Sequence, residues 1–136
     1  MGLGERRAAK QFEDEAYPGL LAEIEKAAGF AVPVEVAWDD LMEEGYGHMY
    51  MEAWYKVYFE PIIVAFKNIT MDAMGKDALK VGLKKIIIQN KSGNYSGSSV
   101  ATFEGGVLTI DHQPMTNIDD LAERAQGIQK TLEAKL

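Results

Sequence analysis

The sequence predicts a single α+β domain, 1–136, with helices packed on one face of an antiparallel sheet of three or four strands. The chain has 136 residues, which is the size of one domain. Much of it carries apolar residues at helical spacing, whereas residues 100–110 alternate in polarity around a pair of glycines. Helices that cover one face of an antiparallel sheet are typical of α+β folds.

The N-terminal part is predicted to form two helices and then a strand. The segment 5–17 is charged and has a weak apolar stripe, as a surface helix does. Pro18 suits the first turn of a second helix over 18–28, because the N–H that proline lacks has no helical partner there, and Gly29 is a natural C-terminal cap. Alternating valines over 32–36, with a proline among them, predict a strand near an edge of the sheet.

The middle of the chain is predicted to form a long helix over 48–66. Asp40 and Glu43 form a capping box ahead of it, and apolar residues recur along it at helical spacing. We expect Pro61 to kink this helix, because proline cannot donate the backbone hydrogen bond. The alternative is a helix that ends earlier and a strand over 62–66.

The remaining residues are predicted to form a basic helix, three strands and a final helix. In order, these segments are 71–82, 86–88, 100–104, 107–110 and 118–132. Gly105 and Gly106 are the strongest hairpin signal, and a two-residue turn there places Phe103 opposite Leu108. Asn117 or Thr116 would cap the final helix. The predicted order is α-α-β-α-α-β-β-β-α, with the last three strands forming an antiparallel meander.

The composition excludes several classes of protein. A net charge of −7 disfavours nucleic acid, because phosphates favour a basic face. No apolar run approaches the ~18 residues of a membrane-spanning helix, and no signal-peptide core opens the chain. The absence of cysteine rules out disulfides and thiolate-bound metals. We expect a cytoplasmic protein with neither a nucleic-acid nor a membrane partner.

The charge is distributed unevenly along the chain. Residues 35–60 carry seven acidic side chains and one lysine, whereas residues 67–91 carry six lysines and two aspartates. Such polarity can steer a charged partner. The alternative is that the two stretches neutralise each other in the fold.

Aromatic residues concentrate in the acidic stretch. Four of them follow one another at intervals of four and would lie on one helical stripe. They are Tyr46, Tyr50, Trp54 and Tyr58. Tyrosine and tryptophan are enriched at binding surfaces, and the interleaved Met49 and Met51 would add adaptable apolar surface. The alternative is a buried stripe whose tyrosine hydroxyls reach the rim of the core, and the sequence leaves both open.

The chain has only two histidines with which to build a metal site. His48 lies four residues before Glu52, so a continuous helix would place both on one face, and such a pair can hold zinc or iron. His112 could complete the site across the core. A zinc-protease pattern needs two histidines at this spacing, however, and only one is present. We expect no cofactor and no metal, with His48, Glu52 and His112 as the only candidates for one.

No motif identifies catalytic residues. The serines between positions 92 and 99 belong to a turn rich in glycine and serine, and the spacing around Gly97 is not that of a nucleophile elbow. The sequence around Gly75 and Lys76 lacks the glycine-rich lead of a phosphate-binding loop. The catalytic residues, if there are any, stay unknown, and a non-enzymatic function is favoured.

We interpret the protein as a non-enzymatic protein-binding module, either an acidic inhibitor or adaptor for a basic partner or a self-associating homodimer. Its docking surface would lie within residues 39–60, and Trp54 and Tyr50 would have to be accessible in the monomer. The predicted partner-binding residues are Glu43, Glu44, Tyr46, Tyr50, Glu52, Trp54 and Tyr55. One alternative is a small-molecule-binding or metal-assisted enzyme with a pocket between the long helix and the sheet. A third hypothesis is a domain with one apolar pocket for a small ligand.

Overall fold

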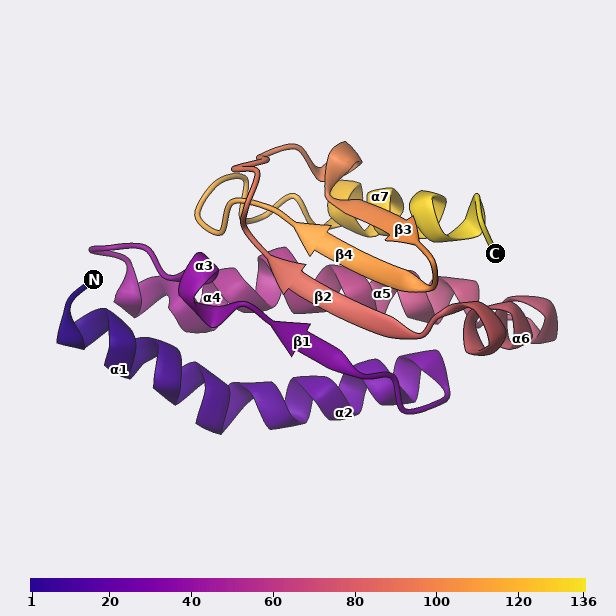
Figure 1. The fold of residues 1–136 in the computed structure, drawn as a ribbon, viewed down its shortest axis with the longest axis horizontal. Coiled ribbons are helices and arrows are strands. Elements are labelled where there is room, and N and C mark those ends of the chain that lie inside the picture. Colours follow the sequence, from indigo (N-terminus) through magenta and orange to yellow (C-terminus); the bar gives the residue numbers. More distant parts are fainter.

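The computed structural model describes all 136 residues and combines a helical layer with a four-stranded sheet (Figure 1). The predicted α+β class is confirmed. The helices are α1 (Leu3–Gln11), α2 (Tyr17–Ala28), α3 (Trp38–Leu41), α4 (Tyr50–Trp54), α5 (Glu60–Ile69), α6 (Ala73–Gly82) and α7 (Leu121–Glu133). The strands are β1 (Val34–Val36), β2 (Lys85–Gln89), β3 (Ala101–Glu104) and β4 (Val107–Asp111).

The sheet is mixed, and the predicted antiparallel meander is wrong. The strand order is β1-β2-β4-β3, with β2 parallel to both β1 and β4, and only β3 antiparallel to β4. Strand β2 does not pair with the next strand in sequence, because residues 90–100 carry the chain to the far edge before the hairpin returns it. The path of such a loop depends on side-chain contacts far from the strands, so the strand patterns do not encode it.

The hairpin register is confirmed. Phe103 pairs with Leu108 and Ala101 pairs with Ile110 across β3 and β4. Gly105 and Gly106 form the turn with φ angles of 58° and 81°. Positive φ at both central residues matches the type I′ turn that suits the strand twist, and glycine adopts it without steric cost.

The N-terminal helix runs from Leu3 to Ala28 and comprises α1, a π-helical turn over Phe12–Ala16, and α2. The predicted division into two helices at Pro18 is therefore wrong. The N–H of Tyr17, just before the proline, donates to the Phe12 carbonyl five residues back. A π turn holds one more residue than an α turn. We infer that this wider turn relieves the contact between the proline ring and the preceding carbonyls, so the helix continues.

The central helix has the same construction and comprises α4, a π-helical turn over Tyr55–Phe59, and α5. The N–H of Glu60, the residue before Pro61, donates to the Tyr55 carbonyl. The expected distortion at Pro61 thus takes the form of a π turn. The alternative strand over 62–66 is wrong, because these residues lie inside α5.

Two predicted helix starts differ from the structure. Asp40 lies in the four-residue helix α3 and caps nothing, and the central helix instead follows a 3₁₀ turn over Gly47–Met49. The final helix begins at Leu121, and Asn117 precedes it in a left-handed conformation with φ of 54°. The predicted element order is therefore wrong. With the N-terminal and central helices each counted once, the observed order is α-β-α-α-α-β-β-β-α.

The core lies between the helical layer and one face of the sheet. Ile86, Ile88, Leu108 and Ile110 point into it from the two central strands and are fully buried. On the opposite face of the sheet, the two edge strands carry exposed polar side chains, namely Glu35 of β1 and Thr102 and Glu104 of β3. Along the long axis, α3 and α4 lie at one end of the molecule and α6 lies at the other (Figure 1). No helix combines the length and the apolar character that crossing a membrane requires.

Candidate functional site

The aromatic stripe of the central helix belongs to the core. Tyr50, Trp54 and Tyr58 are each 0% exposed within the isolated chain, whereas Tyr46 is 43% exposed. The accessibility expected of Trp54 and Tyr50 is therefore wrong. The physical reason is that other elements cover the stripe: Phe12 of the N-terminal helix and Trp38 of α3 pack on Trp54, and the Tyr58 hydroxyl meets the residue after β4. The sequence did not reveal this arrangement.

Contacts around Trp54 show how this part of the core is built. Its ring stacks on Tyr50 with centroids 4.2 Å apart and meets Phe12 of the N-terminal helix edge-on at 5.2 Å. The Tyr50 hydroxyl accepts the Glu43 N–H at 2.8 Å and donates to the Glu43 carbonyl at 3.0 Å. Tyr50 and Trp54 thus fix the loop ahead of the central helix from inside and offer nothing to a partner.

The other predicted partner-binding residues lie at or near the surface. Glu44 and Glu52 are exposed, Tyr55 is half-buried, and Met51 is 40% exposed. Glu43 is partly buried, and its carboxylate accepts a 3.0 Å hydrogen bond from Gln113. Tyr46, Glu44, Met51 and Glu52 therefore remain the accessible members of the predicted docking surface.

The two charged stretches neutralise each other only in part. Lys85 pairs with Glu35 at 2.5 Å, and Lys91 pairs with Asp40 at 2.9 Å. Glu44 makes no ion pair or side-chain hydrogen bond. The acidic end thus keeps charge that nothing in the chain compensates.

The three candidate metal ligands do not form a site. His48 is exposed in the 3₁₀ turn, whereas His112 is fully buried beyond β4. The Glu52 carboxylate instead pairs with Lys56, which also pairs with Asp119. No three His, Asp or Glu side chains are grouped so as to hold a metal ion.

A buried polar cluster lies under the loop after β4, and sequence analysis missed its arginine. Arg124 is fully buried and donates to the carbonyls of Asn117 and Ile118, both at 2.5 Å. Burial lowers the pKa of His112 below 6.5, and the Arg124 charge lowers it further, against the opposing effect of a hydrogen bond with the Gln113 carbonyl. Because Nδ1 faces that carbonyl at 2.6 Å, we assign the proton to Nδ1. The Nε2 atom has no partner.

A groove between the N-terminal and central helices holds two neighbouring pockets. The first has a volume of about 460 Å³ and is mostly apolar. Its lining residues are Phe12, Ala16, Gly19, Leu20, Glu23, Met51 and Tyr55. We call it the apolar pocket.

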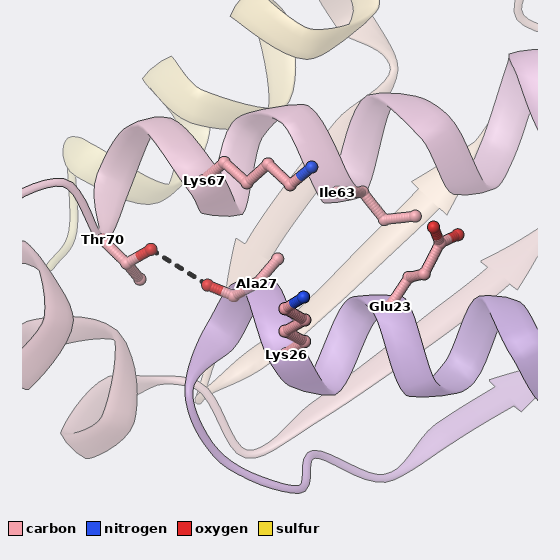
Figure 2. Close-up of a pocket in the computed structure, with 6 residues that line it drawn as sticks. All are labelled: Glu23, Lys26, Ala27, Ile63, Lys67 and Thr70. Carbon is pink, nitrogen blue, oxygen red and sulfur yellow. Dashed lines mark hydrogen bonds between the residues drawn. The ribbon is translucent and has the colours of Figure 1, made fainter.

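The second pocket has a volume of about 370 Å³, and we call it the lysine pocket. Figure 2 shows its lining residues, which come from α2 and from α5 with the residue after it. They are Glu23, Lys26, Ala27, Ile63, Lys67 and Thr70. Because Glu23 lines both pockets, they adjoin along the groove.

The two π-helical turns meet at the apolar pocket. Phe12 and Ala16 begin and end the first turn, and Tyr55 begins the second. Such turns occur frequently at functional sites, because they displace side chains from the regular helical positions. Both turns therefore contribute side chains to the groove.

Two small residues in the sequence mark the position of the groove. Ala16 and Gly19 are small residues three positions apart, so they face one side of the N-terminal helix. A side chain at Gly19 would meet nothing within 4 Å of its Cβ. Where small residues face a neighbouring helix near the surface, they leave a space between the two helices.

Comparison with known protein families, curated proteins and solved structures finds no match. The acidic end and the groove are the two surface features of the chain from which a function can be inferred.

Proposed function

We propose that the protein is a non-enzymatic binding module, an inhibitor or adaptor that docks a partner with a basic surface at its acidic end. The observation that carries this proposal is that Tyr46 and Met51 stay exposed on the segment that carries Glu44, whose carboxylate makes no ion pair. Tyr46 is 43% exposed and Met51 is 40% exposed, although both have large apolar surfaces. Aromatic and methionine side chains are enriched at protein interfaces, where their burial contributes most of the binding energy.

The charge distribution supports the same proposal. The acidic residues of 39–52 lie at the end of the molecule opposite α6, which carries Lys76 and Lys80 (Figure 1). A molecule with separated charges orients an oppositely charged partner during diffusion, and this raises the association rate more than the affinity. Tyr50 and Trp54 take no part in contact, but their packing holds the docking surface in one conformation.

The test uses three versions of the protein as bait for partners from a lysate. The first is the natural protein, and the second carries Glu44→Lys and Glu52→Lys. The third, the control, carries Glu25→Lys and Glu133→Lys, which change the charge equally at exposed positions of α2 and α7, outside residues 39–60. All three should fold with similar stability, because exposed charges contribute at most about 1 kcal/mol.

We expect the natural protein and the control to retain one protein from the lysate. The variant with Glu44→Lys and Glu52→Lys should not retain it. With that protein purified, association with the natural bait should slow as salt rises, and the second bait should show a weaker salt dependence. Retention of the same proteins by all three baits would contradict the proposal. Self-association that depends on Glu44 and Glu52 would instead identify the partner as a second copy of the chain.

A further inference from the structure

The groove between the N-terminal and central helices has a charge arrangement that the docking function does not use. Lys26 and Lys67 line the lysine pocket from α2 and α5, and neither makes an ion pair or a hydrogen bond. The lining holds two lysines and one carboxylate, Glu23, so this pocket carries a charge of +1 on a molecule whose net charge is −7.

The lysine pocket is fixed in shape by a link between the two helices. The Thr70 hydroxyl lies 2.9 Å from the Ala27 carbonyl and 2.8 Å from the Phe66 carbonyl, which share its one proton, and the first contact joins the end of α2 to the residue after α5 (Figure 2). The apolar side chains of Ala27 and Ile63 also belong to the lining. The pocket is therefore present without a ligand, and binding would require little reorganisation.

The adjoining apolar pocket has the opposite character. Of its seven lining residues, only Glu23 is charged, and Glu23 stands where the two pockets meet. Met51 and Tyr55 form the side that the central helix contributes. A ligand that fills both pockets must be apolar at one end and negatively charged at the other.

We propose that this groove binds a single-chain amphiphile with an anionic head group, of which a fatty acid is the simplest. The chain lies in the apolar pocket, and the head group lies between Lys26 and Lys67. The two lysines set this direction, because the apolar pocket contains no basic side chain and its one charged residue, Glu23, is acidic. The helical rise of 1.5 Å per residue puts Phe12 and Lys26 roughly 21 Å apart along the axis, which suits an extended chain better than a compact ligand.

The first experiment measures binding by titration calorimetry with laurate. Laurate should bind the natural protein, whereas acetate, which lacks the chain, and dodecyltrimethylammonium, which carries the opposite charge, should not. Lauryl phosphate distinguishes a requirement for a carboxylate from a requirement for any anion. Equal binding of laurate and dodecyltrimethylammonium would overturn the assignment of the head group to the lysines.

Two lysine variants test the head-group site. The variant with Lys26→Gln and Lys67→Gln should bind laurate about tenfold more weakly or worse, from the loss of two ion pairs. The control variant with Lys76→Gln and Lys80→Gln loses the same charge from exposed positions of α6 and should bind like the natural protein. Equal weakening in both variants would mean general attraction and no site.

A glycine variant tests the chain site. Gly19→Leu should fill the apolar pocket and abolish laurate binding without unfolding the protein, because the added Cβ meets no atom within 4 Å. Gly4→Leu is the matched control, since Gly4 is also helical and has the same free space but lies outside this groove. Undiminished laurate binding by the Gly19 variant, or no binding by the natural protein up to the solubility limit of laurate, would overturn the proposal.

The two proposed sites share Met51, but the charged residues that define them are different. The variant with Glu44→Lys and Glu52→Lys should bind laurate like the natural protein, because neither residue lines the groove. A protein partner that competes with laurate and is lost in the Gly19 variant would show that the groove receives a side chain of a protein, which would contradict the amphiphile assignment.

Discussion

The Tyr58 hydroxyl donates a 2.6 Å hydrogen bond to the backbone carbonyl of His112. This bond links the central helix to the residue that follows β4, and both residues are fully buried. The same burial raises the pKa of the Tyr58 phenol well above its usual range. Because water cannot replace either partner, this contact holds the end of the sheet against the helical layer.

Replacing Tyr58 with phenylalanine should lower the free energy of unfolding by about 1–3 kcal/mol, because the His112 carbonyl then lacks a buried partner. Urea denaturation measures the change. Tyr95→Phe is the control, since Tyr95 is 65% exposed and its hydroxyl makes no hydrogen bond. The control should stay within about 0.5 kcal/mol of the natural protein. Equal stability of the two variants would mean that the buried bond contributes nothing.

The stability should fall with acidification because of His112. Its pKa lies below 6.5 in the folded protein, so the unfolded chain takes up a proton more readily. Its contribution is therefore complete above about pH 6.5 and is lost as the pH falls from there towards the lower folded value. The opposing charges of Asp111 and Glu123 reduce this effect but do not reverse it.

Urea denaturation at several pH values, from neutrality down to below 6.5, measures how the free energy of unfolding changes with pH. His112→Gln should flatten the slope, whatever it does to the absolute stability, because it removes the titrating group. His48→Gln, at an exposed position, should leave it unchanged. A slope that survives in the His112 variant would assign the acid sensitivity to another group.

Truncation of Trp54 distinguishes a core residue from a docking anchor. Trp54→Ala should destabilise the fold by about 3–5 kcal/mol, because its ring packs between Tyr50 and Phe12 and leaves a cavity. Tyr46→Ala should change the stability by less than about 0.5 kcal/mol, because Tyr46 lies on the surface. For partner binding the order is reversed, because Tyr46→Ala should weaken binding more than Trp54→Ala does. Thermal unfolding and the bait experiment report the two properties separately.

Two glycines in helices should respond in opposite ways to alanine. A Cβ at Gly127 of α7 would stand 2.3 Å from the Gly97 carbonyl oxygen, so this helix packs against the 3₁₀ turn over Gly97–Ser99 only without a side chain there. Gly127→Ala should destabilise the protein despite the better helix propensity of alanine. Gly19→Ala, with free space around it, should stabilise it by about 0.5–1 kcal/mol. A gain in melting temperature for both would mean that α7 can shift to accommodate the methyl group.

Local patterns predicted the hairpin correctly because its determinants are local. Gly105 and Gly106 specify a turn, and the turn then fixes which residues of the two strands pair. The pairing of β2 with β1 and β4 has no such determinant. It depends on the loop over residues 90–100, in which the Asn94 side chain bonds to the Ser96 and Ser99 carbonyls. Nothing in the strand segments themselves reports that contact.

The aromatic stripe shows a second limit of sequence reasoning. The interval of four correctly placed Tyr50, Trp54 and Tyr58 on one side of a helix, and periodicity gives no more than that. Which side faces another element depends on tertiary packing, and here the N-terminal helix, α3 and the residue after β4 together cover it. The tyrosine hydroxyls, which favoured a surface in the sequence, find backbone partners instead. The groove was missed because it lies between two helices that are far apart in sequence.

The parallel pairing of β1 with β2 has a consequence for synthesis of the chain. Val34 pairs with Ile86, so the first strand leaves the ribosome well before its neighbour does. The apolar side of the first six helices meanwhile has almost no sheet to cover it, because β2, β3 and β4 follow them in the chain. Contacts between distant residues form slowly, and uncovered apolar surface invites aggregation. The helical part of a nascent chain is therefore at its most prone to aggregation in the interval before β4 emerges.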